Sequence, residues 1–253
     1  MTTKLLKSSL ATTGWLLTLA LPTLPAQAAS FVNQRDALNA NDQIDWASLD
    51  FGVSDLIAPD TIAKFLPYSF TGESQKKLGY SVDIPNLNNP RFTSPFVFPV
   101  TTSVPANFSL GDAVLLTGLI PGRFPAEGNP GPITIKFNQP VLAVGTQLAV
   151  DDQLEEAIAF IQAFDAQDNL LNTFSKPAKS SLEIDNSAAF LGVESEVANI
   201  SKIVISSSIK NRALGINFVS LRYATIPEPA TILGLGLFAM SLLTVKPHIA
   251  SKH

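Results

Sequence analysis

The sequence has no cysteine and only two histidines, His248 and His253, both close to the C-terminal end. Without cysteine, the chain cannot form disulfides, thiolate metal sites or a cysteine nucleophile. The rest of the chain, which has no imidazole, cannot host a Ser-His-Asp triad, a Cys-His dyad or an ordinary zinc site. Carboxylates are left there as the candidates for general acid–base chemistry.

Positive charge is also scarce. The chain has 17 Lys and Arg against 21 Asp and Glu, a formal net charge of −4. The terminal segments contribute four lysines and one acid, so the remainder is more acidic than the whole chain. A nucleic-acid-binding protein needs a basic face to replace counterions. The charge therefore argues against nucleic acid as a partner.

Residues 1–28 have the organisation of a secretory signal peptide. Lys4 and Lys7 form a positive start, and the apolar run that follows, about twelve residues, is shorter than the roughly 20 of a spanning helix. Ala26 and Ala28 place small residues where a signal peptidase inspects the chain, which predicts a mature start at Ala29. The expected partners are the Sec translocon and signal peptidase. An uncleaved membrane anchor is the alternative.

The C-terminal segment, residues 226–253, carries the most specific motif. Pro227, Glu228 and Pro229 precede a run without charge, residues 230–245, and basic residues follow from Lys246. As a helix, the run is about 24 Å long, thin for a hydrocarbon core of about 30 Å. The two prolines cannot continue that helix upstream. The run predicts a transmembrane helix, with a plain C-terminal anchor or a buried core helix as alternatives.

This arrangement resembles the PEP-CTERM sorting signal of exported bacterial proteins, in which Pro-Glu-Pro, an apolar helix and a basic tail follow one another. The resemblance implies recognition of Pro227, Glu228 and Pro229 by an exosortase, a membrane-embedded transpeptidase-like enzyme. The family's tail is usually a cluster of Arg, whereas here it is Lys246-Pro247-His248. The positive-inside signal is weaker as a result.

Residues 29–225 form one domain in which the pattern is β throughout. Ile133–Phe137 alternates with period two and is expected to end at Asn138-Gln139-Pro140, while 157–164 is apolar on both faces, as in a central strand. Short strands at this spacing predict an all-β fold, an antiparallel two-sheet sandwich of jelly-roll type. The expected strands are 80–84, 92–100, 112–117, 133–137, 141–150, 157–164, 170–174, 188–193, 200–206 and 213–223.

One segment has two interpretations. Residues 151–163 could begin as a helix after Asp151 and Asp152, because Glu155 and Glu156 would lie near its N-terminus. The second half of the segment favours a strand.

Residues 105–223 resemble a set of exported PEP-CTERM proteins, many of them cyanobacterial. The resemblance implies a jelly roll of the galactose-binding-like or lectin-like type. Most proteins of that set have no assigned activity. Where that set carries an Ile-Asp or Ile-Asn step in the last strand, this chain has Ile216-Asn217. The similar segments are 111–115, 131–135, 140–141, 143–147, 161–165, 189–193, 203–206 and 215–217.

Aspartates are the candidate metal ligands. Asp151, Asp152, Asp165 and Asp168 carry the hard oxygens that Ca²⁺ prefers, although no EF-hand loop is present. A structural Ca²⁺ is the only cofactor this composition suggests. The simpler interpretation is that Asp165 and Asp168 cap a hairpin turn. A glycan hydrolase would instead need two of the carboxylates to face each other across a groove.

Trp46 is the candidate ligand platform, because a sugar packs its C–H face on an exposed aromatic ring. The alternative places Trp46 as a plug at the edge of the sandwich. The sequence thus predicts an exported, non-catalytic module at the cell surface or in the extracellular matrix, associated with exopolysaccharide or envelope. A carboxylate-dependent glycan hydrolase and a membrane-anchored structural protein are the alternatives.

Overall fold

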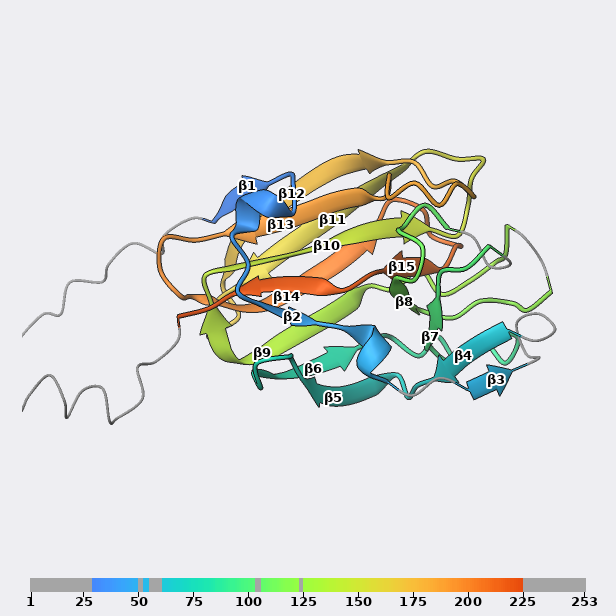
Figure 1. Ribbon diagram of the computed structural model, residues 1–253, viewed down its shortest axis with the longest axis horizontal. Coiled ribbons are helices and arrows are strands. Elements are labelled where there is room, and N and C mark those ends of the chain that lie inside the picture. Colours follow the sequence, from blue (N-terminus) through green and yellow to red (C-terminus); the bar gives the residue numbers. More distant parts are fainter. Residues whose placement is uncertain (1–28, 50–51, 55–60, 103–105, 123–124, 225–253) are drawn as a thin grey trace, which may run out of the picture.

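Two antiparallel sheets make up the protein. In the computed structural model, residues 29–49, 52–54, 61–102, 106–122 and 125–224 are described, and they contain strands and two 3-10 helices. The strands pack as a β-sandwich (Figure 1). The all-β, two-sheet architecture expected from the alternating pattern is confirmed.

The larger sheet has ten strands, in the order β1-β13-β10-β15-β8-β7-β4-β3; in addition, β16 pairs with β10, and β2 pairs with β16. The 3-10 helices η1 (Asp36–Leu38) and η2 (Trp46–Ser48) flank β2 in the chain. The strands are β1 (Ser30–Val32), β2 (Asp42–Ile44), β3 (Gly52–Ser54), β4 (Thr61–Phe65), β7 (Phe96–Pro99), β8 (Ala113–Leu116), β10 (Ala143–Val150), β13 (Ala189–Glu194), β15 (Leu214–Ile216) and β16 (Val219–Arg222).

The smaller sheet has six strands, in the order β12-β11-β14-β9-β6-β5. Buried and more exposed residues alternate along β6 and β11, because one face packs on the core and the other faces water. The strands are β5 (Ser69–Glu73), β6 (Gly79–Asp83), β9 (Ile133–Val141), β11 (Ala157–Phe164), β12 (Leu170–Ala178) and β14 (Ile200–Ser207).

The main core fills the space between the sheets with aliphatic side chains. From β9, β11 and β14 it takes Ile135, Ile161 and Ile203, and from β10 it takes Val144 and Leu148. Burial of this apolar surface is the main stabilising term of such a sandwich.

Three sequence-based expectations are wrong in detail. Strand β9 continues through Asn138-Gln139-Pro140 to Val141, because an irregularity in its pairing with β14 accommodates these residues. Strand β11 begins at Ala157 and lies between β12 and β14, as the strand interpretation predicted, but only its alternate residues are buried, so the expectation of a strand that is buried on both faces is wrong. The segment 213–223 is two strands, β15 and β16, separated at Asn217-Phe218.

That separation divides the ten-stranded sheet. The far half of β10 pairs with β15, through Leu148, Ala149 and Val150. The near half of β10 pairs with β16, through Ala143, Val144 and Gly145. Asn217 therefore lies at a fork, where the sheet continues toward β8 in one direction and toward β2 in the other.

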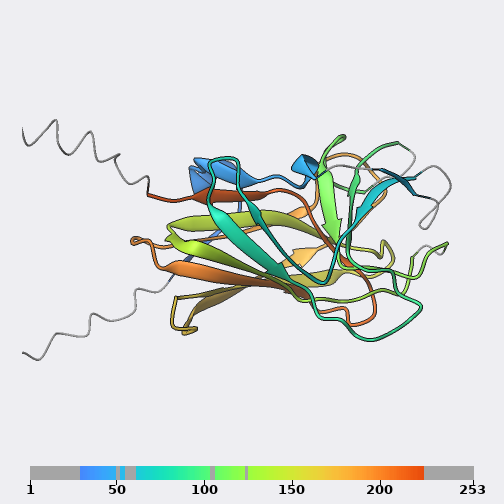
Figure 2. The same ribbon diagram turned by 90° about the horizontal axis from the view of Figure 1, so that it is seen from below.

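Both ends of the described chain lie at one end of the sandwich, here named the base. Ser30 pairs with Glu194, Glu194 with Ala143, and Ala143 with Arg222, so the first and last strands end side by side. Figures 1 and 2 show both chain ends on the same side. The opposite end, named the far end, carries the loops after β10, β12 and β14.

Candidate functional site

Trp46 is buried in the core and is not an exposed ligand platform. Its side chain is 0% exposed and its ring meets Tyr80 edge-on, with 6.1 Å between centroids. The indole Nε1 donates a hydrogen bond of 2.9 Å to the carbonyl of Asn217. The Asp45 side chain caps η2 by accepting from the Ala47 N–H at 2.9 Å, which fixes Trp46 facing inward. The interpretation of Trp46 as a sugar platform is therefore wrong, because no ring face is available.

Asp165 and Asp168 shape the β11–β12 hairpin at the base. Asp165 accepts hydrogen bonds from the N–H groups of Gln167 and Asn169, and the side-chain amide of Asn169 is the main cause of its lowered pKa. Asp168 adopts a positive φ of 63° and pairs with Lys202 at 2.5 Å, which lowers its pKa. The Asp165 carboxylate therefore stabilises the turn, and the Asp168 carboxylate connects the turn to Lys202 of β14.

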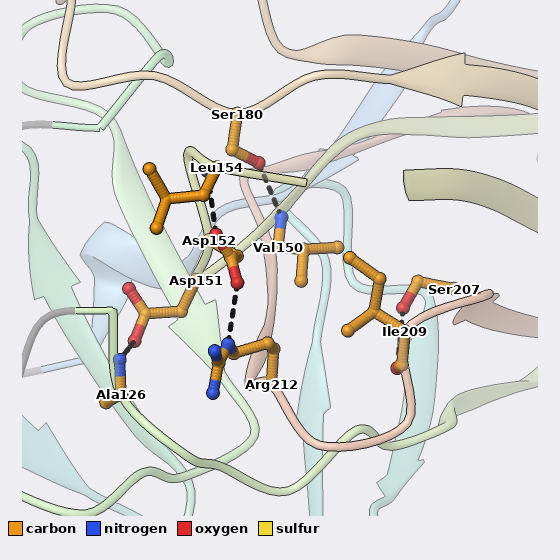
Figure 3. Close-up of polar contacts among 9 residues, drawn as sticks. All are labelled: Ala126, Val150, Asp151, Asp152, Leu154, Ser180, Ser207, Ile209 and Arg212. Atoms are coloured by element: carbon orange, nitrogen blue, oxygen red, sulfur yellow. Dashed lines mark hydrogen bonds and ion pairs between the residues drawn. The ribbon is translucent and has the colours of Figure 1, made fainter. Parts of the chain in front are cut away.

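Asp151 and Asp152 lie at the far end, directly after β10 (Figure 3). Asp152 is 2% exposed and accepts from Arg212 Nε at 2.7 Å and from the Leu154 N–H at 2.7 Å. Burial raises the pKa of Asp152, but the hydrogen bonds from Arg212 and the backbone outweigh it and lower the pKa. Asp151 accepts from the Ala126 N–H at 3.4 Å.

The two aspartate pairs do not form a common site. Asp151 and Asp152 precede β11, whereas Asp165 and Asp168 follow it. A strand of this length, at about 3.4 Å per residue, separates the two pairs by about 25 Å. Within the described part of the chain, no group of three or more His, Cys, Asp or Glu is placed to hold a metal ion. Asp151 and Asp152 are therefore too far from Asp165 and Asp168 for the two pairs to bind the same ion, because β11 lies between them.

Asp151 has an expected effect on the pH dependence of stability. Burial disfavours its charged form and raises its pKa to about 6, and the Ala126 N–H and Arg212 offset this only in part. The native state thus binds the proton more tightly than the unfolded chain. As the pH rises from about 4 to about 6, this group therefore lowers the free energy of unfolding. We expect Asp151→Asn to raise the free energy of unfolding near neutral pH by about 1–2 kcal/mol.

Urea unfolding at about pH 4 and about pH 7 measures this effect, because the gain should vanish at the lower pH, where the native carboxyl is already protonated. Glu183→Gln removes an exposed carboxylate from the loop after β12 and should change stability little at either pH. An equal gain at both pH values would contradict the assignment to Asp151.

The most extensive polar cluster is one that sequence reasoning did not identify, and it centres on Arg35. The guanidinium donates from Nη1 to Ser220 Oγ at 2.6 Å, and from Nη2 to Asn217 Oδ1 at 2.9 Å and to Gln147 Oε1 at 3.2 Å. Burial lowers the pKa of Arg35 to about 10, although Asp112 and Asp36 oppose this. Arg35 therefore remains charged at neutral pH and binds the fork of the sheet to the segment before η1.

Two aromatic rings enclose the same guanidinium. Its Cζ lies 3.7 Å from the Phe218 ring centroid and 5.1 Å from that of Phe190. The Phe190 ring can lie over the sheet only because Gly145 is beneath it: a Cβ there would be 2.5 Å from Phe190 Cζ. Cation–π contact adds attraction that is stronger where water is excluded.

Asn217 completes the cluster and requires an amide. Its Oδ1 accepts from the Gln147 N–H at 3.1 Å, and its Nδ2 donates to Gln147 Oε1 at 2.7 Å and to Asp112 Oδ2 at 2.9 Å. A carboxylate at this position could not donate to Asp112 and would repel it. The Asn form of the Ile-Asn step thus matches its surroundings. Since these groups satisfy one another, the cluster acts as a structural joint rather than a reactive centre.

The far end also has a pocket of about 500 Å³, within the range of about 300–1,000 Å³ that is typical of small-molecule sites. It opens between β12 and the start of β13. One carboxylate, that of Glu156, lines it, so its lining supplies no carboxylate pair for glycoside hydrolysis. The lining residues are Glu156, Lys176, Pro177, Lys179, Ser181, Ser187, Ala188 and Ala189.

The sorting motif Pro227-Glu228-Pro229 and the predicted cleavage residues Ala26 and Ala28 lie outside the described residues. Ala29 is buried, and its carbonyl accepts from Asn172 Nδ2 at 2.9 Å. None of the helices within the described ranges is both long and apolar enough to cross a membrane.

Comparison with solved structures gives distant similarities, of which two are described here. A DUF4465 family protein from Bacteroides caccae aligns over 69% of this chain and 99% of its own, with 9% identity and a TM-score of 0.36. The enzymatically active domain of tailspike protein 4 of bacteriophage CBA120 aligns over 61% of this chain and 19% of its own, with 15% identity and a TM-score of 0.23. No family model and no curated protein matches the chain. At these values neither structure bears on its function.

Proposed function

We propose that this chain is an exported, non-catalytic protein that an exosortase sorts to the cell surface or extracellular matrix. The observation that carries the proposal is Pro227-Glu228-Pro229 followed by the uncharged run 230–245 and basic residues, which resembles the PEP-CTERM signal. The body would associate with exopolysaccharide or envelope, after passage through the Sec translocon and cleavage by signal peptidase.

The position of the chain ends supports this arrangement. The last described residues are bound at the base: Asn41 and Tyr223 exchange hydrogen bonds, and Arg222 Nη2 pairs with Glu194 at 3.1 Å. A body held through the segment after residue 224 would therefore direct its far end away from the attachment. The pocket would face the matrix.

We also propose that the sandwich is a jelly roll of the galactose-binding-like or lectin-like type. In support, the chain crosses repeatedly from one sheet to the other. It leaves the small sheet after β9 and returns to it after β10, and it leaves the small sheet again after β12 and returns after β13. Non-catalytic action is supported by the paired groups of the Arg35 cluster and by the single carboxylate in the pocket lining. The carboxylates of the four aspartates form ion pairs or hydrogen bonds with other residues of this chain, which supports a body that needs no Ca²⁺.

The proposal is tested by fractionating producing cells and measuring the intact mass of the protein in each fraction. We expect it with the extracellular polysaccharide, starting at Ala29 and lacking the apolar run 230–245. A chain that keeps residues 230–253 in the membrane fraction would indicate a plain anchor instead. An unprocessed chain in the cytoplasm would refute export altogether.

A further inference from the structure

We infer that the pocket between β12 and β13 binds an anionic sugar unit, one that carries a carboxylate or a sulfate ester. This inference rests on the proposed function, because it assigns the ligand class and the site for association with polysaccharide. It follows from the volume of the pocket, from its two lysines, which form no ion pair among the described residues, and from its hydroxyl groups.

The pocket lies where the edge of the sandwich is open. Lys176 pairs with Ala159 across β11 and β12, on the face of the small sheet that packs on the core. Because β12 is an edge strand and Ala157 and Ala159 are small, the two sheets leave space here, and Lys176 enters it half-buried. Ala188 and Ala189 supply the opposite wall from the start of β13.

The lining has an excess of positive charge. Lys176 and Lys179 contribute two ammonium groups and Glu156 one carboxylate. The ion pairs formed among the described residues involve other side chains, so both ammonium groups are available. The chain as a whole is acidic, so this local excess is opposite in sign to the net charge of the chain. An anionic group on a ligand would meet both lysines.

The rest of the lining suits a sugar ring. Ser181 and Ser187 present hydroxyl groups, and Glu156 can accept from sugar hydroxyls, while Pro177 and the alanines offer apolar surface. Asn107, 1% exposed, holds this wall: its Nδ2 donates to the carbonyl of Lys179 at 3.0 Å and to Ser187 Oγ at 3.4 Å.

The test measures binding of short labelled oligosaccharides to the full-length chain in a neutral detergent, by fluorescence anisotropy. Trigalacturonate and a sulfated galactose trimer supply the two anionic groups, and a neutral galactose trimer is the matched control ligand. The pocket variant is K176Q/K179Q. The control variant K64Q/K210Q removes two exposed lysines that do not line the pocket. Thermal melts establish that both variants remain folded.

We expect at least one of the two anionic trimers to bind, the neutral trimer to fail, and K176Q/K179Q to weaken binding by about tenfold or more, since each lysine makes a charge-assisted contact. K64Q/K210Q should bind within about twofold of the unchanged chain. The anionic trimer that binds identifies the group as carboxylate or sulfate.

Binding that K176Q/K179Q leaves unchanged, or no binding of either anionic trimer, would overturn the inference. Cell fractionation distinguishes failure of the pocket assignment from failure of the proposed function. If K176Q/K179Q remains with the extracellular polysaccharide like the unchanged chain, only the pocket assignment fails. If the unchanged chain is absent from that fraction, the proposed function fails.

Discussion

Replacing Arg35 with alanine is expected to lower the free energy of unfolding by about 3 kcal/mol. The substitution removes three charge-assisted hydrogen bonds, to Ser220, Gln147 and Asn217, and the cation that lies between two aromatic rings. Asn217 Oδ1 and Gln147 Oε1 keep the donors that these two residues give each other, whereas Ser220 Oγ loses its hydrogen bond to the guanidinium. The segment before η1 should also detach from the sheet, which hydrogen exchange at residues 30–44 would show.

Chemical denaturation of two further variants separates this effect from a general loss of positive charge. Arg91→Ala removes an exposed ion pair with Glu127, whose side chains are 65% and 48% exposed, and should cost less than about 0.5 kcal/mol. Arg35→Lys keeps the charge but loses the planar fork, and should cost nearly as much as alanine. If Arg35→Ala were as mild as Arg91→Ala, the cluster would not be a structural joint.

Replacing Trp46 with alanine is expected to cost about 3–5 kcal/mol, because the substitution leaves a large cavity among Tyr80, Phe70 and the residues around the fork. Trp46→Phe keeps most of the volume but leaves the Asn217 carbonyl without the indole donor. Its cost should be smaller, about 1–3 kcal/mol. Thermal and urea unfolding followed by the near-UV signal measure both.

The control for this series is Leu154→Ala, at a side chain that is 76% exposed, which should change stability by less than about 0.5 kcal/mol. Trp46→Phe should bind polysaccharide as the unchanged chain does, since the ring lies in the core. A specific loss of sugar binding in folded Trp46→Phe, without destabilisation, would contradict the buried placement.

The strands that the sequence predicted well are short apolar segments. Residues 157–164 are apolar except at Gln162, residues 200–206 carry four aliphatic side chains, and the structure places strands at Ala157–Phe164 and Ile200–Ser207. Such a segment shows its strand character within a short window of sequence. The two-sheet architecture follows from many such windows.

The departures arise where distant partners decide the local structure. Residues 213–223 look like one strand, but Asn217 is held by Gln147, Asp112 and Arg35, each more than 60 residues away. Those contacts replace the hydrogen bonds that a continuous strand would have made. Likewise, Asn138-Gln139-Pro140 reads as a stop signal, yet pairing with β14 carries β9 past it.

The candidate site shows the same limit. The sequence offers Asp151, Asp152, Asp165 and Asp168 as candidate ligands without saying how far apart they lie, and β11 places the first two and the last two at opposite ends of the sandwich. Arg35 had no local signal, because all the acceptors of its side-chain hydrogen bonds come from residues 147–220. The lysines of the pocket were equally hidden, since only the edge position of β12 explains why Lys176 faces the space between the sheets.

The most direct test of the account is co-sedimentation of the full-length chain with the producing strain's own extracellular polysaccharide, in Ca²⁺ and in EDTA. The account predicts saturable binding that is the same in both conditions, because the carboxylates of Asp151, Asp152, Asp165 and Asp168 are held by protein partners. Binding that disappears in EDTA would contradict the calcium-free body and restore a metal site. No saturable binding in either condition would contradict association with the polysaccharide itself.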